Sequence, residues 1–298
     1  MMGLPLAAID GSVLQYFQYE YMQRALLVGV LVAVLTGLLG VFLVLRQMSL
    51  LGDGLAHVSF AGIAVGLAAG IYPTGVALVA SVVGAVAIYF LRERGIVKGD
   101  TAIGILLTAS FALGVVVISA SKGFVNTNAY LFGNILAISD QDLKVVLGVG
   151  VALVVLVLAF YKEFVSMTFS EEAARVTGLP VDLLNVVFVS LTAATIVVAS
   201  RIVGVLLVSG LIVIPAATAL QLARGFKRAI VLSVTVGLAS VVAGILVAAQ
   251  QGWAVGGTIA LVAASCFLLA TIGRRTLRRK PTPEPSPAPA PPRARHAR

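Results

Sequence analysis

An aspartate and a histidine four residues apart are the first side chains whose types could bind a metal ion. Asp53 and His57 lie in the segment GDGLAH, residues 52–57, and residues spaced by four share one face of a helix. A carboxylate oxygen and an imidazole nitrogen suit divalent cations such as Zn²⁺ or Mn²⁺. Without a cysteine partner the pair would bind weakly, which suits the passage of an ion better than its storage. The structural alternative is that Asp53 caps a helix and that His57 is hydrogen-bonded inside a helical bundle.

A short polar segment, FSEEAARVTGLP at residues 169–180, is the second candidate. Ser170 is a favoured residue for capping a helix start, and Glu171 and Glu172 follow where the helix dipole stabilises negative charge. Gly178 and the proline after Leu179 would end the helix. Because a helix of about two turns is unstable alone in water, this one must dock on the rest of its own chain or in a groove of a partner.

The composition indicates that both candidate segments belong to a protein whose helices span a membrane. Of the 298 residues, 60% are hydrophobic and only 11% are charged, against about 25% charged in soluble domains. A water-soluble globule of this size cannot bury so much apolar surface. Cys266, the single cysteine, lies in an apolar run, so neither a disulfide nor a thiolate metal cluster is predicted.

Nine apolar stretches are long enough to be membrane-spanning helices, which need about 20 residues each. We therefore predict an all-α fold, a polytopic bundle of about nine spans. The stretches are 24–45, 55–71, 74–91, 101–120, 143–161, 181–199, 203–222, 229–249 and 257–272. Glycines at 62, 66 and 70 recur on one face of the second stretch, where a neighbouring backbone can approach closely.

The basic residues predict the orientation, because cytoplasmic loops are enriched in lysine and arginine. Most of the 21 fall in alternate loops or in the tail: Arg46, Arg92, Arg94, Lys98, Lys162, Arg175, Arg224, Lys227, Arg228, Arg274, Arg275, Arg278, Arg279 and Lys280. The opposite side carries only Arg24, Lys122, Lys144 and Arg201. This asymmetry predicts an external N-terminus and a cytoplasmic C-terminus. It also favours loops and lipid headgroups over nucleic acid as the explanation of the net charge of +9.

Other transport and enzyme classes lack their usual signatures. None of the 12 acidic residues falls at the centre of a predicted span, which weakens the case for a secondary carrier. The chain contains no phosphate-binding loop of the form GxxxxGK[ST], no HExxH and no GxSxG. If ATP drives transport, a separate subunit must hydrolyse it, and we predict that the chain is not itself an enzyme.

Five segments together resemble the permease subunits of ATP-binding-cassette importers for zinc, manganese and iron, the ABC-3 family. The resemblance covers roughly residues 24–272. The segments are MSLLGDGLAHVSFAGIAVG (48–66), KGDTAIGILLTASFALGVVVIS (98–119), LFGNILAIS (131–139), EEAARVTGLPVDLLN (171–185) and RIVGVLLVSGLIVIPAATA (201–219).

The resemblance implies a set of partners and a set of site residues. A homodimer, or a pair with a close relative, would be driven by two cytoplasmic ATPases and supplied by an external metal-binding protein, with no cofactor held permanently. Asp53, His57 and Asp100 stand in polar segments typical of the family, although for Asp100 we favour a role as the cap of the fourth span. Contact with the ATPase is implied for six positions: Ser170, Glu171, Glu172, Ala173, Ala174 and Gly178. The segment matches the EAA-type coupling loop of importers up to Gly178 and lacks its distal I-x-L-P part.

We therefore expect a permease in the bacterial inner membrane that forms the path of a divalent transition metal. Its parts would be an external segment (1–23), a permease domain (24–273) with a coupling loop at 162–180, and a basic, Pro-rich, disordered cytoplasmic tail (274–298) that holds seven of the 11 prolines. Between residues 123 and 142 we predict a re-entrant or surface-lying helix, since its apolar part is too short to cross. The rival functions are a permease for iron chelates or corrinoids, a stand-alone secondary carrier, and a scaffold.

Overall fold

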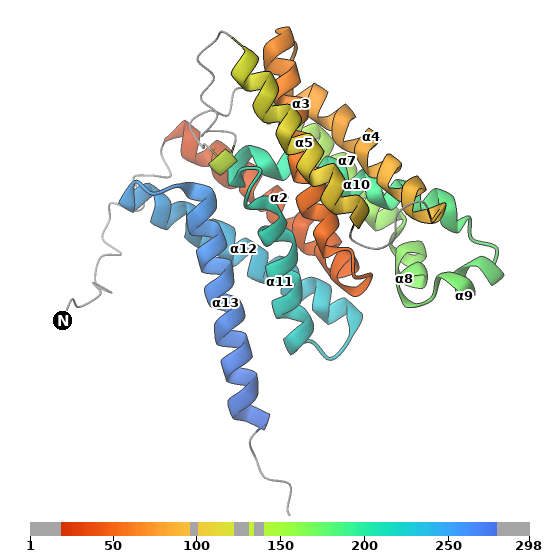
Figure 1. Cartoon of the computed structure of the whole chain (residues 1–298). Helices are drawn as coiled ribbons and strands as arrows, with labels where there is room; N and C mark the ends of the chain where they lie inside the picture. The colour runs from red at the N-terminus through yellow and green to blue at the C-terminus, as the bar shows by residue number, and fades with distance from the viewer. Residues whose placement is uncertain (1–18, 96–100, 122–130, 134–139, 279–298) are drawn as a thin grey trace, which may run out of the picture.

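The computed structural model describes residues 19–95, 101–121, 131–133 and 140–278, and these residues form helices and no strands (Figure 1). The helices are α2 (Glu20–Leu45), α3 (Ser49–Ala69), α4 (Pro73–Glu93), α5 (Thr101–Ala120), α7 (Asp140–Ala159), α8 (Tyr161–Phe169), α9 (Glu171–Val176), α10 (Val181–Val203), α11 (Val208–Leu222), α12 (Phe226–Gln251) and α13 (Val255–Arg278). The all-α prediction is confirmed for this part of the chain. The predicted disordered tail (274–298) begins too early, because α13 continues to Arg278. Residues 279–298 and most of the predicted helix between 123 and 142 lie outside the described residues.

Each of the nine predicted spans coincides with a helix, but not every helix is long enough to cross a bilayer. In the part of the chain that the structure describes, seven helices are long and apolar enough on their own. α7 and α8 qualify only as a pair bent by 61°, and α11 has 15 residues, fewer than the usual 20 or so. α11 begins at Val208, five residues later than predicted, because Gly204 combines a positive φ of 86° with an extended ψ of 156°, a backbone conformation that interrupts the helix. The count of nine crossings stays a prediction.

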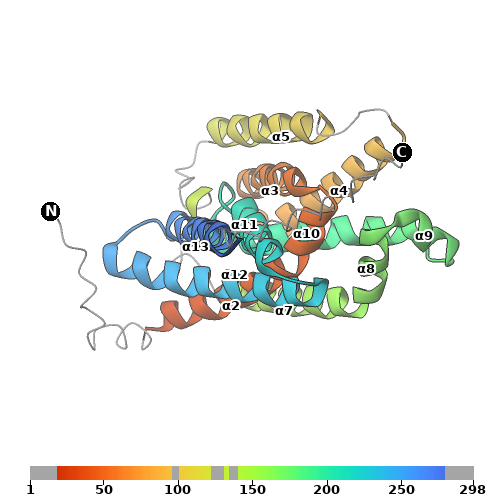
Figure 2. The same cartoon turned by 90° about the horizontal axis from the view of Figure 1, so that it is seen from below.

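The helices are arranged in layers around α10 (Figure 2). α5 forms one outer edge and packs on α3, whereas α2, α7 and α12 form the opposite edge, with α10, α11 and α13 between. In the most apolar part of α10, 78% of the residues are buried, against 22% in α5. Since both helices are apolar, the exposed side of α5 is suited to lipid or to another protein and not to water.

Small residues join α3 to α4, as predicted from the repeated glycines. A Cβ atom on Gly62 would lie 2.6 Å from the Cα of Ala77, and one on Gly66 would lie 2.7 Å from the Cα of Pro73. The two backbones therefore touch, and no larger residue fits at either position. Gly70 plays a different part: it ends α3 in the left-handed conformation (φ 68°), a usual helix C-terminus.

The connections between helices gather at two ends of the bundle. At one end, which we call the α9 end, the α2–α3 turn, the end of α4, α9 and the start of α10 line one cavity, and the start of α12 packs nearby through Phe226. At the other end, residues 131–133 contact the α10–α11 connection and the start of α13. This grouping agrees with the alternate loops predicted from the basic residues. Which side of the membrane each end faces stays a prediction.

Candidate functional site

The candidate ligands Asp53 and His57 both lie inside α3. This helix begins at Ser49, six residues before the predicted start, and its N-cap residue, Met48, makes no side-chain capping hydrogen bond. Asp53 is thus in the second turn, and its predicted alternative role as a helix cap is wrong. The glycines on either side of Asp53 permit close packing and do not break the helix: a Cβ on Gly52 would lie 3.5 Å from Ser209, and one on Gly54 would lie 3.0 Å from Ile103.

His57 of α3 packs against α5, and one of its two ring nitrogens has no hydrogen-bond partner among the described residues. The imidazole ring meets Phe111 edge to face, with 5.1 Å between the ring centroids. Its Nδ1 atom is buried and has no hydrogen-bond partner among the described residues, so the alternative in which His57 is a satisfied interior histidine is wrong for this atom. A buried unpaired polar atom costs about 1–3 kcal/mol, a cost that a bound cation or water would remove. The hydroxyl of Ser59 in α3 is likewise buried and, within the described ranges, has no hydrogen-bond partner.

The structure brings two of the three predicted metal ligands together. Asp53 and His57 occupy adjacent turns of one helix face. Asp100 lies outside the described residues, directly before the first residue of α5, so both of its predicted roles stay predictions. Among the residues that the structure describes, no group of three or more His, Cys, Asp and Glu side chains is close enough to hold a metal ion.

The predicted coupling segment forms α8 and α9, which lie side by side at the α9 end (Figure 1). Ser170 caps α9 as predicted, because its Oγ accepts a hydrogen bond from the backbone N–H of Ala173 at 3.1 Å. Gly178, with φ 83°, follows α9 in the left-handed conformation that a non-glycine residue rarely adopts. Both local predictions for this segment, the capped start and the glycine near the end, are confirmed.

One face of this segment docks on the chain and the other is exposed. Phe164 of α8 packs against Phe42 of α2 and Phe188 of α10, with ring centroids 6.1 Å and 5.4 Å away, and Ala174 of α9 is fully buried. On the other face, Val176 is 89% exposed and Phe169, just before the cap, is 71% exposed. The predicted docking on the chain's own helices is therefore correct for one face of α9, and the opposite face offers apolar surface to a partner.

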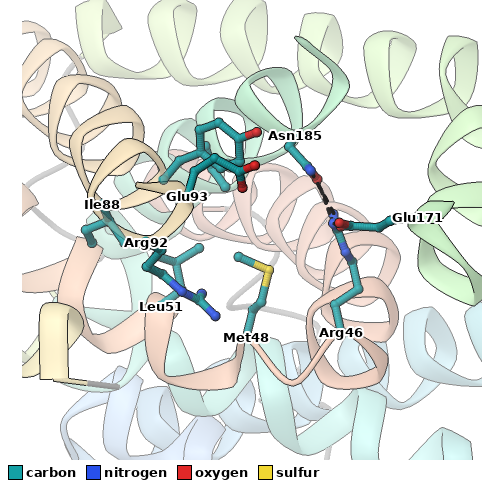
Figure 3. Close-up of a pocket in the computed structure, with 10 residues that line it drawn as sticks. Arg46, Met48, Leu51, Ile88, Arg92, Glu93, Glu171 and Asn185 are labelled. Carbon is teal, nitrogen blue, oxygen red and sulfur yellow. Dashed lines mark hydrogen bonds and ion pairs between the residues drawn. The ribbon is translucent and has the colours of Figure 1, made fainter. Parts of the chain in front are cut away.

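An arginine with a largely covered side chain ties α9 to the membrane helices. Arg46 follows the last residue of α2 and forms an ion pair with Glu171, the first residue of α9. The same guanidinium donates a hydrogen bond of 2.6 Å to Oδ1 of Asn185 in α10 and lies over the ring of Phe188, 5.1 Å from its centroid. Figure 3 shows Arg46, Glu171 and Asn185 with Met48 beside them, and all four line a cavity of about 290 Å³.

A second ion pair closes the turn between α9 and α10. Arg175 donates a 3.2 Å hydrogen bond from Nη1 to Oδ2 of Asp182, and both side chains are exposed. Tyr89 of α4 donates to Oδ1 of the same carboxylate at 3.3 Å. The hydrogen bonds to Asp182, and then the charge of that carboxylate, raise the pKa of Arg175 further above its ordinary high value. The guanidinium is therefore charged at every physiological pH.

No role was predicted for the contacts that Arg46 and Asn185 make with each other and with Glu171. Arg46 served only as one of the basic residues that indicate orientation, and Asn185 only as the end of a resembling segment. A signal was present in each case, since a charged or amide side chain next to an apolar span needs a partner. The sequence does not say which partner, because Arg46 and Glu171 are 125 residues apart.

Comparison with known proteins places the whole membrane domain in one family. Residues 18–274 match the ABC 3 transport family. The manganese transport system membrane protein MntC of Halalkalibacterium halodurans is 36% identical over 257 residues, covering 86% of this chain and 88% of that protein. The high-affinity zinc uptake system membrane protein ZnuB of Haemophilus influenzae is 32% identical over 261 residues, covering 87% and 100%.

A solved structure shares both the fold and the sequence pattern. The structure described as PsaBC from Streptococcus pneumoniae in complex with Fab has a chain that is 33% identical, with a TM-score of 0.81, covering 91% of this chain and 99% of that one. The matches span all the helices described above, and the predicted resemblance is confirmed. The chain is a multi-pass membrane protein that belongs to the ABC 3 transport family, as one of its permeases.

Proposed function

We propose that the chain forms the path by which an importer of the bacterial cytoplasmic membrane carries a divalent transition metal, manganese, zinc or iron. The relatives named above are manganese and zinc transport proteins. The observation that carries the proposal is the Asp53–His57 pair, which offers oxygen and nitrogen on one face of a helix and includes a buried imidazole nitrogen without a partner. In such a mixed pair the imidazole suits Zn²⁺ and Fe²⁺, and the carboxylate suits Mn²⁺.

The site needs ligands from beyond one chain. Zinc sites usually have four ligands, whereas the described part of this chain brings together two. A second copy would supply another Asp53–His57 pair. The outer side of α5, next to the helix that carries this pair, is available for such a copy, because Gly104, Thr108 and Ala112 line an open groove of about 660 Å³. Small residues at this spacing permit close helix approach.

Energy would come from ATPase subunits that dock on the exposed face of α9. The chain has no phosphate-binding loop, so hydrolysis belongs to a partner. Glu172 and Ala173 are exposed beside the apolar side chains of Phe169 and Val176, and together they form a small projecting surface that a cleft can hold. In this arrangement the α9 end faces the cytoplasm, and an external binding protein delivers the metal at the opposite end.

Metal uptake into vesicles that hold the complete transporter tests the proposal. Asp53→Asn and His57→Gln should each lower uptake at least about tenfold. Mutation of a residue that only orients a metal ligand already costs about 10–100-fold in affinity or activity, and loss of a ligand itself should cost no less. His296→Gln, which changes the other of the two histidines, is the matched control and should transport normally. Equal amounts of assembled complex must be shown for all three variants.

Three results would contradict the proposal. If both ligand variants carry metal normally, the Asp53–His57 pair is not part of the path. If the unmodified protein carries an iron chelate or corrinoid and no free metal, the path is not a metal-ion path. If the permease alone carries metal without any ATPase, the chain is a secondary carrier and the coupling role of α9 is wrong.

A further inference from the structure

The turn between α2 and α3 connects the coupling segment with the helix that carries the candidate ligands. Arg46 follows α2, and α3 begins three residues later at Ser49. Three backbone hydrogen bonds fix the turn: Arg46 N to Phe42 O at 3.0 Å, Gln47 N to Val44 O at 3.2 Å and Met48 N to Leu43 O at 2.9 Å. The turn is therefore a rigid joint, and a displacement of Arg46 must move the first turn of α3.

The side chain of Arg46 is held more firmly than an ordinary surface arginine. It is only 10% exposed, whereas Glu171 is 47% exposed. Asn185 binds both members of the pair: its Oδ1 accepts from Arg46, and its Nδ2 donates to Glu171 Oε1 at 3.5 Å. A planar guanidinium with several hydrogen-bond partners has few alternative geometries. Removing Glu171 would leave the largely covered charge of Arg46 without its ionic partner.

The cavity beside Arg46 gives the α2–α3 turn room to move. Met48 and Leu51, from the N-cap and first turn of α3, line one side, and Ile88 and Arg92 of α4 line another (Figure 3). Most protein interiors are too closely packed to allow such a shift without overlap. Asp53 follows Ser49 by four residues, about 6 Å along the helix axis, so it lies within the part of α3 that the turn would move.

We propose that Arg46 is a positioning residue that transmits the movement of α9 to the ligand-bearing part of α3. When an ATPase displaces α9, Glu171 pulls Arg46, the rigid turn follows, and the placement of Asp53 and His57 changes. The inference rests on the proposed function, because it needs an ATPase at α9 and a metal at α3. It assigns a role that neither the basic-residue pattern nor the resemblance to coupling loops gives to Arg46.

The test compares metal uptake with ATP hydrolysis in vesicles containing the full transporter. In Arg46→Gln, the metal taken up per ATP hydrolysed should fall at least about tenfold, because the link to α9 is lost while α9 still meets the ATPase. The equilibrium affinity of the detergent-purified complex for Mn²⁺ should stay unchanged in the absence of ATP. Arg92→Gln removes the same charge beside the same cavity and should keep the normal ratio. The exchange Arg46→Glu with Glu171→Arg should recover part of it.

The outcomes separate this inference from the proposed function. If the unmodified complex shows no ATP-driven uptake of metal, the proposed function fails first. If it transports and Arg46→Gln lowers uptake and hydrolysis in proportion, Arg46 has only a structural role and the inference is wrong. Should Arg46→Gln fail to assemble, Glu171→Gln, which changes the more exposed member of the pair, decides the question by the same ratio.

Discussion

The two ends of the helical bundle are joined in opposite ways. At the α9 end, long side chains connect the helices: Arg46 reaches α9 and α10 beside a cavity of about 290 Å³. At the other end, three glycines bring backbones into direct contact, and we call them the glycine junction. A Cβ on Gly133 would lie 2.0 Å from Ile202 O, one on Gly204 would lie 2.4 Å from Leu131 O, and one on Gly256 would lie 1.8 Å from Val203 O.

This difference indicates which end can move. A cluster of side chains next to a cavity can be displaced as a unit without overlapping its neighbours, so the helices that it connects can shift together. Where two backbones touch at a glycine, neither can shift toward the other without atomic overlap. The glycine junction is therefore suited to act as a fixed reference for α10 and α13, and the α9 end as the part displaced against it.

Gly256→Ala should have the largest effect. The new methyl group would overlap the carbonyl oxygen of Val203, which is backbone and cannot rotate away. We expect a loss of folding stability of about 3 kcal/mol or more, seen as a clear fall in the melting temperature of the purified protein or as a failure to assemble. The measurement is thermal unfolding followed by size-exclusion chromatography in detergent.

The neighbouring glycine provides the control for this prediction. Gly257 lies in the same turn of α13 and has open space where a Cβ would be. Gly257→Ala should leave the melting temperature unchanged or raise it slightly, since alanine is the better helix former. If the two variants melt alike, the close contact at the glycine junction does not hold that end together.

The features that could be predicted from the sequence depend on residues that are close together along the chain. The nine apolar runs became helices, and Ser170 caps α9, because helix length and capping depend on local residues. The start of α3 was predicted too late because Asp53, between two glycines, looks like a helix start. The packing of these glycines on Ser209 and Ile103 comes from residues distant in sequence, and tertiary contacts of this kind override local preference.

The candidate site follows the same division. The Asp53–His57 pair was predictable because a spacing of four residues places both on one face. The Arg46–Glu171–Asn185 cluster was not, since it depends on which helix ends meet, and its members are separated by up to 139 residues. The glycine junction was not predictable either, because its three glycines are far apart in the sequence and nothing local indicates that they meet.

Ser170→Ala should have an intermediate effect, limited to the α9 end. Loss of the cap on a helix of six residues costs about 1 kcal/mol, enough to fray α9 while the membrane helices stay folded. Hydrogen exchange at the amides of 171–176 should become roughly five to ten times faster, with the melting temperature nearly unchanged. Ser170→Thr keeps a capping hydroxyl and should exchange as the unmodified protein does; equal exchange in Ser170→Ala would show that docking alone holds α9.

Asp182→Asn should have the smallest effect of the series. The pair with Arg175 is exposed on both sides, so solvent and salt screen it. The amide oxygen of the new side chain can still accept the long 3.3 Å hydrogen bond from Tyr89 of α4. Because the hydrogen bond to Asp182 raises the pKa of Arg175, the arginine keeps its charge throughout the range of about pH 5 to 9, and no pH dependence of stability there can arise from its titration. We expect an unchanged melting temperature and, at low salt only, slightly faster hydrogen exchange in residues 177–181. A large loss of uptake per ATP in this variant would mean that the surface pair, and not the largely covered Arg46, carries the movement of α9 into the membrane.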